Sequence, residues 1–130
     1  MEIHIRPVVP AEASIWEKLR CELWPDGAAE HRGEIAAFFA GTLDEPDAVL
    51  VAEDPARNIV AFAELSIRTD LPGLQGVRAG YVEGLYVIPA LRRSGVTRKL
   101  LQASRDWARR QDCGAFASDR AERIILDQSF

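Results

Sequence analysis

The sequence predicts a single mixed α/β domain (α+β), in which a mixed central sheet is flanked by helices. The first observation is that segments with the two-residue apolar spacing of strands alternate with segments that have helical spacing. The second is that 130 residues, 48% of them hydrophobic, suffice for one sizeable core and not for two. We therefore expect one domain that spans residues 1–130.

The first third of the chain is predicted to form one strand and two helices. Residues 3–7 alternate apolar and polar side chains, as a half-buried strand does. Residues 11–23 place their apolar side chains on one helical face, and Pro25–Gly27 then interrupts the chain. A second helical pattern covers residues 31–43. His31 is therefore expected to start a helix rather than to take part in catalysis.

Strands dominate the middle of the chain. Residues 48–53 and 59–68 are predicted to form a hairpin, because both are rich in β-branched and apolar residues and turn residues separate them. Residues 70–80 contain three glycines and are expected to form a long, flexible loop, whose length favours a functional role. A third strand over 81–88 follows, and a short buried strand is predicted at 114–117.

The segment from residue 81 to residue 101 is the most informative part of the chain. Its strand ends at Pro89, and a helix begins at Val96 after the basic stretch Arg92-Arg93-Ser94-Gly95. The first turn of a helix has unpaired N–H groups and the positive end of the helix dipole, so it suits a phosphate or pyrophosphate. Taken alone, the stretch also fits an ordinary strand-loop-helix connection with solvated arginines.

Composition excludes several classes of protein. The net charge of −4 argues against nucleic acid and is compatible with a small cationic substrate. No stretch approaches the roughly 20 apolar residues that span a bilayer, and no secretion signal is evident, so we expect a cytoplasmic protein. Cys21 and Cys113 lie far apart and no histidines cluster, so neither a metal site nor a disulfide framework is predicted.

The spacing of Arg92, Gly95 and the small residue Thr97 resembles the pyrophosphate loop of the GNAT superfamily of N-acetyltransferases, Gln/Arg-x-x-Gly-x-Gly/Ala. Thr97 stands where that pattern has Gly or Ala. The order of the predicted elements also resembles the fold of this family. Five segments in the same order are similar to the aminoglycoside 6'-N-acetyltransferases in particular: residues 19–26, 63–68, 82–89, 92–96 and 116–119.

This resemblance implies transfer of an acetyl group from acetyl-CoA to the 6'-amine of an aminoglycoside, and hence antibiotic resistance. It assigns catalysis to Glu83 and Asp119, which would also contact the substrate together with Trp24 and Asp26. In such enzymes the cosubstrate lies where two parallel strands splay apart. The residues that the resemblance assigns to acetyl-CoA are Leu85, Tyr86, Val87, Arg92, Arg93, Ser94, Gly95, Val96, Thr97 and Arg98.

Each of the proposed site residues also has a structural interpretation. Glu83 would share a strand face with Tyr81, Leu85 and Val87, and could be a carboxylate at the rim of the sheet that pairs with Arg68 or Arg78. Asp119 and Glu122 fit a helix-capping pair. A large aromatic side chain such as Trp24 at a helix end is commonly part of a core.

The resemblance weakens after Asp119, because residues 120–130 do not match the helix and strands with which such enzymes continue. We expect the C-terminal helix and strands to be shortened or missing, and a homodimer in which Ile124, Ile125 and Leu126 help to cover the exposed surface. Two other functions stay open: acetylation of another small amine or a peptide terminus, and an inactive remnant that only binds acetyl-CoA.

Overall fold

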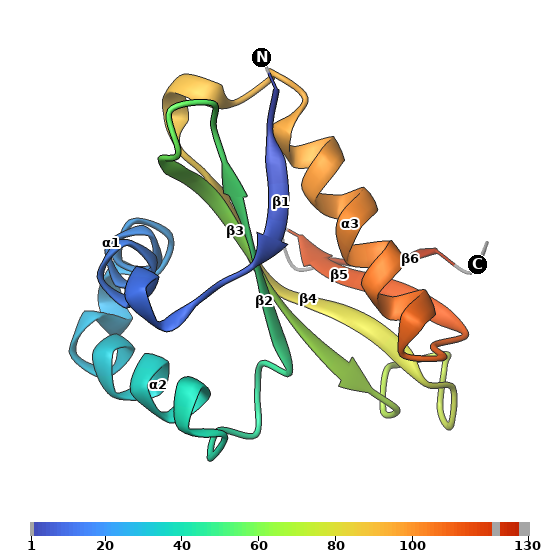
Figure 1. Ribbon diagram of the computed structural model, residues 1–130. Helices are drawn as coiled ribbons and strands as arrows, with labels where there is room; N and C mark the ends of the chain where they lie inside the picture. Colours follow the sequence, from blue (N-terminus) through green and yellow to red (C-terminus); the bar gives the residue numbers. More distant parts are fainter. Residues whose placement is uncertain (1, 121–122, 128–130) are drawn as a thin grey trace.

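The computed structural model describes residues 2–120 and 123–127, with side chains described as far as Ser118 (Figure 1). Its centre is a six-stranded sheet whose strands follow one another in chain order. All neighbouring strands are antiparallel except β4 and β5, which are parallel. The strands are β1 (His4–Pro7), β2 (Ala48–Glu53), β3 (Ile59–Arg68), β4 (Ala79–Val87), β5 (Ala115–Arg120) and β6 (Arg123–Asp127). The predicted mixed sheet is confirmed.

Helices cover both faces of this sheet. Helices α1 (Ala13–Leu23) and α2 (Ala28–Ala40) lie on one face, and α3 (Val96–Arg110) lies on the other (Figure 1). Three short 3-10 turns each begin with a proline: η1 (Pro10–Glu12), η2 (Pro25–Gly27) and η3 (Pro89–Leu91). The last two start at the prolines that the sequence analysis interpreted as the ends of elements.

The core is divided by the alternation of side chains along the central strands. Phe62 of β3 packs in the cluster beneath α1 and α2, whereas its neighbours Ala61 and Ala63 pack in the cluster beneath α3. Trp16 and Leu100, both almost fully buried, anchor α1 and α3 to these two clusters. Burial of this apolar surface on both sides of the sheet is the main source of stability for the fold.

The structure moves several predicted boundaries. Strands β2 and β3 have the predicted bounds, but α2 begins at Ala28, directly after η2, so His31 lies inside the helix and is buried. The same helix ends at Ala40, because Gly41 adopts the left-handed conformation (φ 75°) that caps it. The helix predicted to extend to residue 43 is therefore too long at its C-terminal end.

The long loop before β4 is shorter and better packed than expected. β4 begins at Ala79, because Ala79 and Gly80 pair with the end of β3. Within the remaining connection, Leu71 and Leu74 are buried and pack with Tyr81. These two leucines are therefore packed into the fold, and residues 79 and 80 of the predicted loop belong to β4 instead.

The C-terminal end also differs from the prediction. β5 continues to Arg120, three residues beyond the predicted strand, and β6 pairs antiparallel with it. Ile124, Ile125 and Leu126, the predicted dimer contact, lie on β6, but their side chains are outside the described residues. One strand therefore follows β5 in the region where the sequence predicted the C-terminal helix and strands to be shortened or missing.

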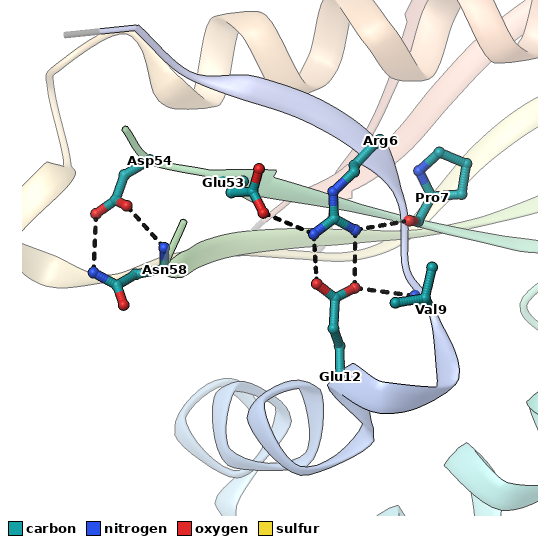
Figure 2. A network of polar contacts seen from close by, with 7 residues as sticks. All are labelled: Arg6, Pro7, Val9, Glu12, Glu53, Asp54 and Asn58. Atoms are coloured by element: carbon teal, nitrogen blue, oxygen red, sulfur yellow. Dashed lines mark hydrogen bonds and ion pairs between the residues drawn. The ribbon is translucent and has the colours of Figure 1, made fainter. Parts of the chain in front are cut away.

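An ion-pair network fastens the first strand to the turn that follows it (Figure 2). The guanidinium of Arg6 donates to both carboxylate oxygens of Glu12, at 2.9 and 2.5 Å, and to Glu53 at 2.9 Å. Glu12 also accepts a hydrogen bond from the backbone N–H of Val9 at 3.0 Å. Arg6 therefore links β1, η1 and β2, and its hydrogen bonds hold the pKa of Glu12 below its ordinary value.

We expect this network to make stability depend on pH. The contribution of Glu12 is fully present above the pKa of an unfolded glutamate, about 4.3, and is lost as the pH falls through the lower pKa of the folded state. Urea unfolding of Glu12→Gln should therefore show a shallower loss of stability on acidification than unfolding of the unmodified chain. Parallel pH profiles for the two proteins would contradict this assignment.

Candidate functional site

A β-bulge shapes the centre of the site. In the pairing of β3 with β4, Glu64 lies opposite Gly84 and Leu65 lies opposite Val82, so Glu83 is an extra residue on β4. A bulge bends its strand and increases the local twist. The parallel pairing of β4 with β5 covers residues 79–82 of β4, up to the bulge. The two parallel strands therefore stop pairing at the bulge, and we call the place where they part, next to Glu83, the fork.

A cavity of about 630 Å³ lies at this fork. Val82, Gly84, Leu85, Tyr86 and Val87 of β4 line one side of it. The other lining residues come from α1, the loop after β4, α3 and β5, and are Glu22, Leu23, Arg92, Thr97, Leu101, Arg105, Phe116 and Ser118. The structure thus brings Leu85, Tyr86, Val87, Arg92 and Thr97, all predicted to bind the cosubstrate, to one cavity.

A second hollow, of about 580 Å³, adjoins the first at the start of α3. Arg93, Gly95 and Arg98 line it, and Thr97 borders both hollows. Gly95 precedes the helix in a left-handed conformation (φ 94°), and no side chain caps the first turn. The N–H groups of that turn are therefore available to an anion, as the sequence predicted.

Three residues of the predicted loop differ from the expected arrangement. Arg92 turns back toward β4: its Nε donates to the Val87 carbonyl at 3.0 Å, and its guanidinium lies 5.3 Å from the centre of the Tyr86 ring. The Ser94 hydroxyl donates to the Leu91 carbonyl. Val96 is buried in the core beneath α3, so only its backbone faces the loop.

Tyr86 is a polar group on the wall of the larger cavity. Its hydroxyl donates to a carboxylate oxygen of Glu22 at 3.0 Å. Burial and the neighbouring Glu22 carboxylate raise the pKa of Tyr86, so this hydroxyl stays protonated at neutral pH. Sequence reasoning did not pair these two residues, because α1 and β4 are distant in the chain.

Glu83, Arg68 and Glu45 form a cluster of charged side chains. Both carboxylate oxygens of Glu83 accept hydrogen bonds from Arg68, at 2.9 and 3.0 Å, and Arg68 also contacts Glu45 at 3.2 Å. Arg68, and not Arg78, is thus the partner of Glu83, since Arg78 donates to the Gln111 carbonyl. Two carboxylates and one guanidinium give this cluster a formal charge of −1.

Glu45 is the member of this cluster that the sequence did not indicate. It lies in the turn after α2, just beyond the helical pattern predicted over residues 31–43. Partial burial and the nearby Glu83 carboxylate raise the pKa of Glu45. The acidic residues flanking this turn give no local signal that one of them reaches the end of β3.

The bulge also corrects the predicted faces of β4. Leu85 and Val87 pack with Val82 in the cluster beneath α3, whereas Tyr81 packs with Leu71 in a separate cluster. Strict alternation is broken at the bulge, because the extra residue reverses the direction of every following side chain. The prediction that Tyr81, Leu85 and Val87 share one face of the strand was therefore wrong.

The remaining predicted site residues lie around the end of α1 and on β5. The half-buried Trp24 packs its ring against Gly84, the residue that follows Glu83. Asp26 is exposed in η2, two residues after Trp24. Asp119 lies on β5, opposite Ile124, and its side chain is outside the described residues. Because residue 119 belongs to a strand, the helix-capping interpretation of Asp119 was wrong.

The bulged sheet, the parallel strands that part beside the bulge and the uncapped start of α3 match the arrangement that the sequence resemblance implied. The sequence model of the Acetyltransferase (GNAT) family matches residues 13–124, and the chain belongs to this family. The sequence prediction of a GNAT acetyltransferase is confirmed. Among the described residues, no helix has the length and apolar character to cross a membrane.

Two similar proteins indicate which kind of acetyltransferase the chain resembles. The chain is 44% identical over 116 residues to the aminoglycoside N(6')-acetyltransferase type 1 of Klebsiella aerogenes, covering 88% of this chain and 76% of the relative. It is 35% identical over 128 residues to the protein of the same name from Acinetobacter haemolyticus, covering 98% of this chain and 86% of that one.

Solved structures of similar enzymes share the fold. The aminoglycoside antibiotic 6'-N-acetyltransferase AAC(6')-Ih of Acinetobacter baumannii superimposes with a TM-score of 0.79 at 32% identity, over 92% of this chain and 80% of the other. AAC(6')-Iy, in complex with the bisubstrate analogue CoA-S-monomethyl-acetylneamine, has a TM-score of 0.81 at 26% identity, over 93% and 81%. The fold therefore matches that of an enzyme whose structure was solved in complex with a bisubstrate analogue.

Proposed function

We propose that this chain transfers the acetyl group of acetyl-CoA to the 6'-amine of an aminoglycoside and thereby confers antibiotic resistance. The observation that carries the proposal is the net negative cluster of Glu45, Arg68 and Glu83 at the fork of β4 and β5. The positive charge of one protonated amine would neutralise the net charge of −1 on this cluster. The names of the relatives support the choice of an aminoglycoside as the amine.

The reaction needs a group that removes a proton from the amine. An alkyl amine is mostly protonated at neutral pH and becomes a nucleophile only after it loses that proton. In the proposal, Glu83 holds the ammonium and accepts the proton, and Asp119 is the second carboxylate. The free amine then attacks the thioester carbon and the C–S bond breaks. One N–H proton of the attacking amine passes to the sulfur, so that the products are the amide and the thiol of coenzyme A.

Trp24 and Asp26 would contact the sugar, since both lie at the junction of α1 and α2, where the Trp24 ring packs against Gly84 of the bulged strand. The junction gives Trp24 a flat apolar wall and leaves the Asp26 carboxylate exposed to a cationic ring. This side of the fork would be the acceptor side.

The opposite side of the fork would hold acetyl-CoA. Backbone groups of Leu85, Tyr86 and Val87 would pair with pantetheine, and one N–H there would stabilise the oxyanion that forms on the thioester. The pyrophosphate would lie against the start of α3. The residues proposed to surround it are Arg92, Arg93, Ser94, Gly95, Val96, Thr97 and Arg98, with Val96 contributing only its backbone.

Gly95→Ala should weaken acetyl-CoA binding about tenfold. Alanine in the left-handed conformation costs roughly 1–2 kcal/mol, so the loop would relax away from the geometry that presents its N–H groups. Gly41→Ala is the matched control, since Gly41 also has a positive φ (75°) and open space around it, but it caps α2. Calorimetric titration with acetyl-CoA measures both variants, and equal affinities would remove the loop from the proposed site.

The function is tested by the release of thiol from acetyl-CoA in the presence of different amines. We expect turnover with kanamycin and tobramycin and little with a polyamine or a peptide amine. Faster turnover with a polyamine or a peptide would replace the proposed substrate. Binding of acetyl-CoA without turnover of any amine would identify an inactive acetyl-CoA-binding protein instead.

We further propose that residues 1–130 act as one domain in the cytoplasm and form a homodimer. β6 is the last strand of the described sheet, and an open sheet edge favours pairing with another chain (Figure 1). Light scattering across micromolar concentrations tests the assembly, and a monodisperse monomer would exclude it. Cell fractionation tests the location.

A further inference from the structure

A buried charged cluster lies behind the proposed acceptor site and does not line the cavity. Arg20 of α1 and Glu64 of β3 are 5% and 2% exposed. Arg20 donates to both carboxylate oxygens of Glu64, at 2.6 and 3.0 Å, and the Trp16 indole N–H donates to the same carboxylate at 3.0 Å. A buried ion pair is weak evidence for stability, because desolvation offsets much of its attraction. The residues that this ion pair positions are therefore a better explanation for it than its own contribution to stability.

His31 connects this cluster to Trp24. The Arg20 guanidinium lies 3.1 Å from Nδ1 of His31, and since arginine can only donate, Nδ1 must be the acceptor. The proton of the neutral imidazole is then on Nε2, which donates to the Trp24 carbonyl at 2.9 Å. The backbone N–H of Gly27 donates to the same carbonyl at 3.1 Å. His31 is thereby fixed in one tautomer by its neighbours.

Trp24 is held at both backbone groups and at its ring. Its N–H donates to the Arg20 carbonyl at 2.7 Å, while His31 binds its carbonyl. The Arg20 guanidinium lies 5.3 Å from the centre of the indole ring. On the other side, the ring occupies the space over Gly84, where a Cβ would overlap two of its carbon atoms. The only side chain that fits at residue 84 beneath this ring is a hydrogen atom.

We propose that Arg20, His31 and Gly84 are positioning residues that hold the Trp24 ring beside Glu83, so that they set the affinity for the amine acceptor and not for acetyl-CoA. This inference rests on the proposed function of the site. The three residues come from α1, α2 and β4, so the position of the acceptor wall is set jointly by the two helices and the bulged strand.

Two substitutions of His31 separate its two hydrogen bonds. The amide of asparagine reaches the position of Nδ1 and can still accept from Arg20, whereas the longer glutamine places an N–H donor near Nε2. His31→Asn should therefore lose the bond to Trp24 and raise KM for kanamycin about tenfold, with KM for acetyl-CoA within about twofold. His31→Gln should rescue most of the kanamycin KM.

Two glycine substitutions on β4 give a second, matched test. A Cβ on Gly84 would displace the Trp24 ring, whereas a Cβ on Gly80 would lie 2.6 Å from Cβ of Ala108, beneath α3. Both variants strain the same strand, but only Gly84→Ala should raise KM for kanamycin, by about tenfold or more. The fluorescence of Trp24 is the part of the tryptophan emission that is lost in Trp24→Phe. Gly84→Ala should also shift this emission.

The outcomes separate the inference from the proposed function. Parallel increases of both KM values in Gly84→Ala, or equal effects of Gly80→Ala, would overturn the positioning role. If the unmodified chain fails to acetylate kanamycin, the proposed substrate is wrong, and the Trp24 emission still decides the inference. An unchanged Trp24 emission in both His31→Asn and Gly84→Ala would then overturn the inference. A shifted emission in these two variants, with an unchanged emission in His31→Gln and Gly80→Ala, would support it.

Discussion

Glu83→Gln should lower kcat for aminoglycoside acetylation about a hundredfold or more. Glutamine has the shape of glutamate and can keep one of the two hydrogen bonds from Arg68 through its amide oxygen, but its NH2 group cannot accept the other, and it cannot take a proton from the amine. The charge of the Glu45, Arg68 and Glu83 cluster would also rise from −1 to zero, which weakens its attraction for an ammonium group. Thiol release under saturating acetyl-CoA measures the change.

Glu17→Gln is the control for this variant. It makes the same chemical change on α1, where Glu17 pairs with the exposed Arg32 at 3.3 Å. We expect its kcat to match that of the unmodified chain, and KM for acetyl-CoA to stay constant in both variants. A Glu83→Gln enzyme with undiminished kcat would show that another group, such as Asp119, removes the proton.

Glu64→Ala should lower the free energy of unfolding by about 3–5 kcal/mol. The substitution leaves the Arg20 guanidinium buried without its main partner and removes the acceptor of the Trp16 indole N–H. It also opens a space beside β3 in the cluster beneath α1 and α2. Equilibrium unfolding in urea measures the loss.

Glu17→Ala provides the comparison for stability, because it breaks an ion pair whose arginine is 85% exposed. We expect a loss below about 1 kcal/mol for that variant. A similarly small loss for Glu64→Ala would mean that Arg20 turns to Glu34, which already lies 3.5 Å away and is partly exposed. Glu34 would then replace Glu64 as the partner of Arg20, and the Arg20–Glu64 pair would contribute less to the free energy of unfolding than its short contacts indicate.

Local patterns predicted the elements that depend on neighbours in the sequence. Strands β2 and β3 and the start of α3 have the predicted bounds, because alternation, helical spacing and turn residues lie within short windows. The loop with Gly95 was likewise recognisable, since its geometry depends on a few consecutive residues. Boundaries moved where pairing with a distant strand decided them, as at Ala79 and at β6.

The sequence by itself therefore determined the class of fold, the order of its elements as far as β5, and the helix start that is proposed to bind an anion. Tertiary structure alone decided that Glu83 is a bulge residue, that it pairs with Arg68, and that Arg20 meets Glu64 across 44 residues of chain. The physical reason is that strand register and buried charge pairs depend on contacts between distant segments, which periodicity does not encode. The position of Trp24 against Gly84 belongs to this second group, since it forms only when α1 packs on β4.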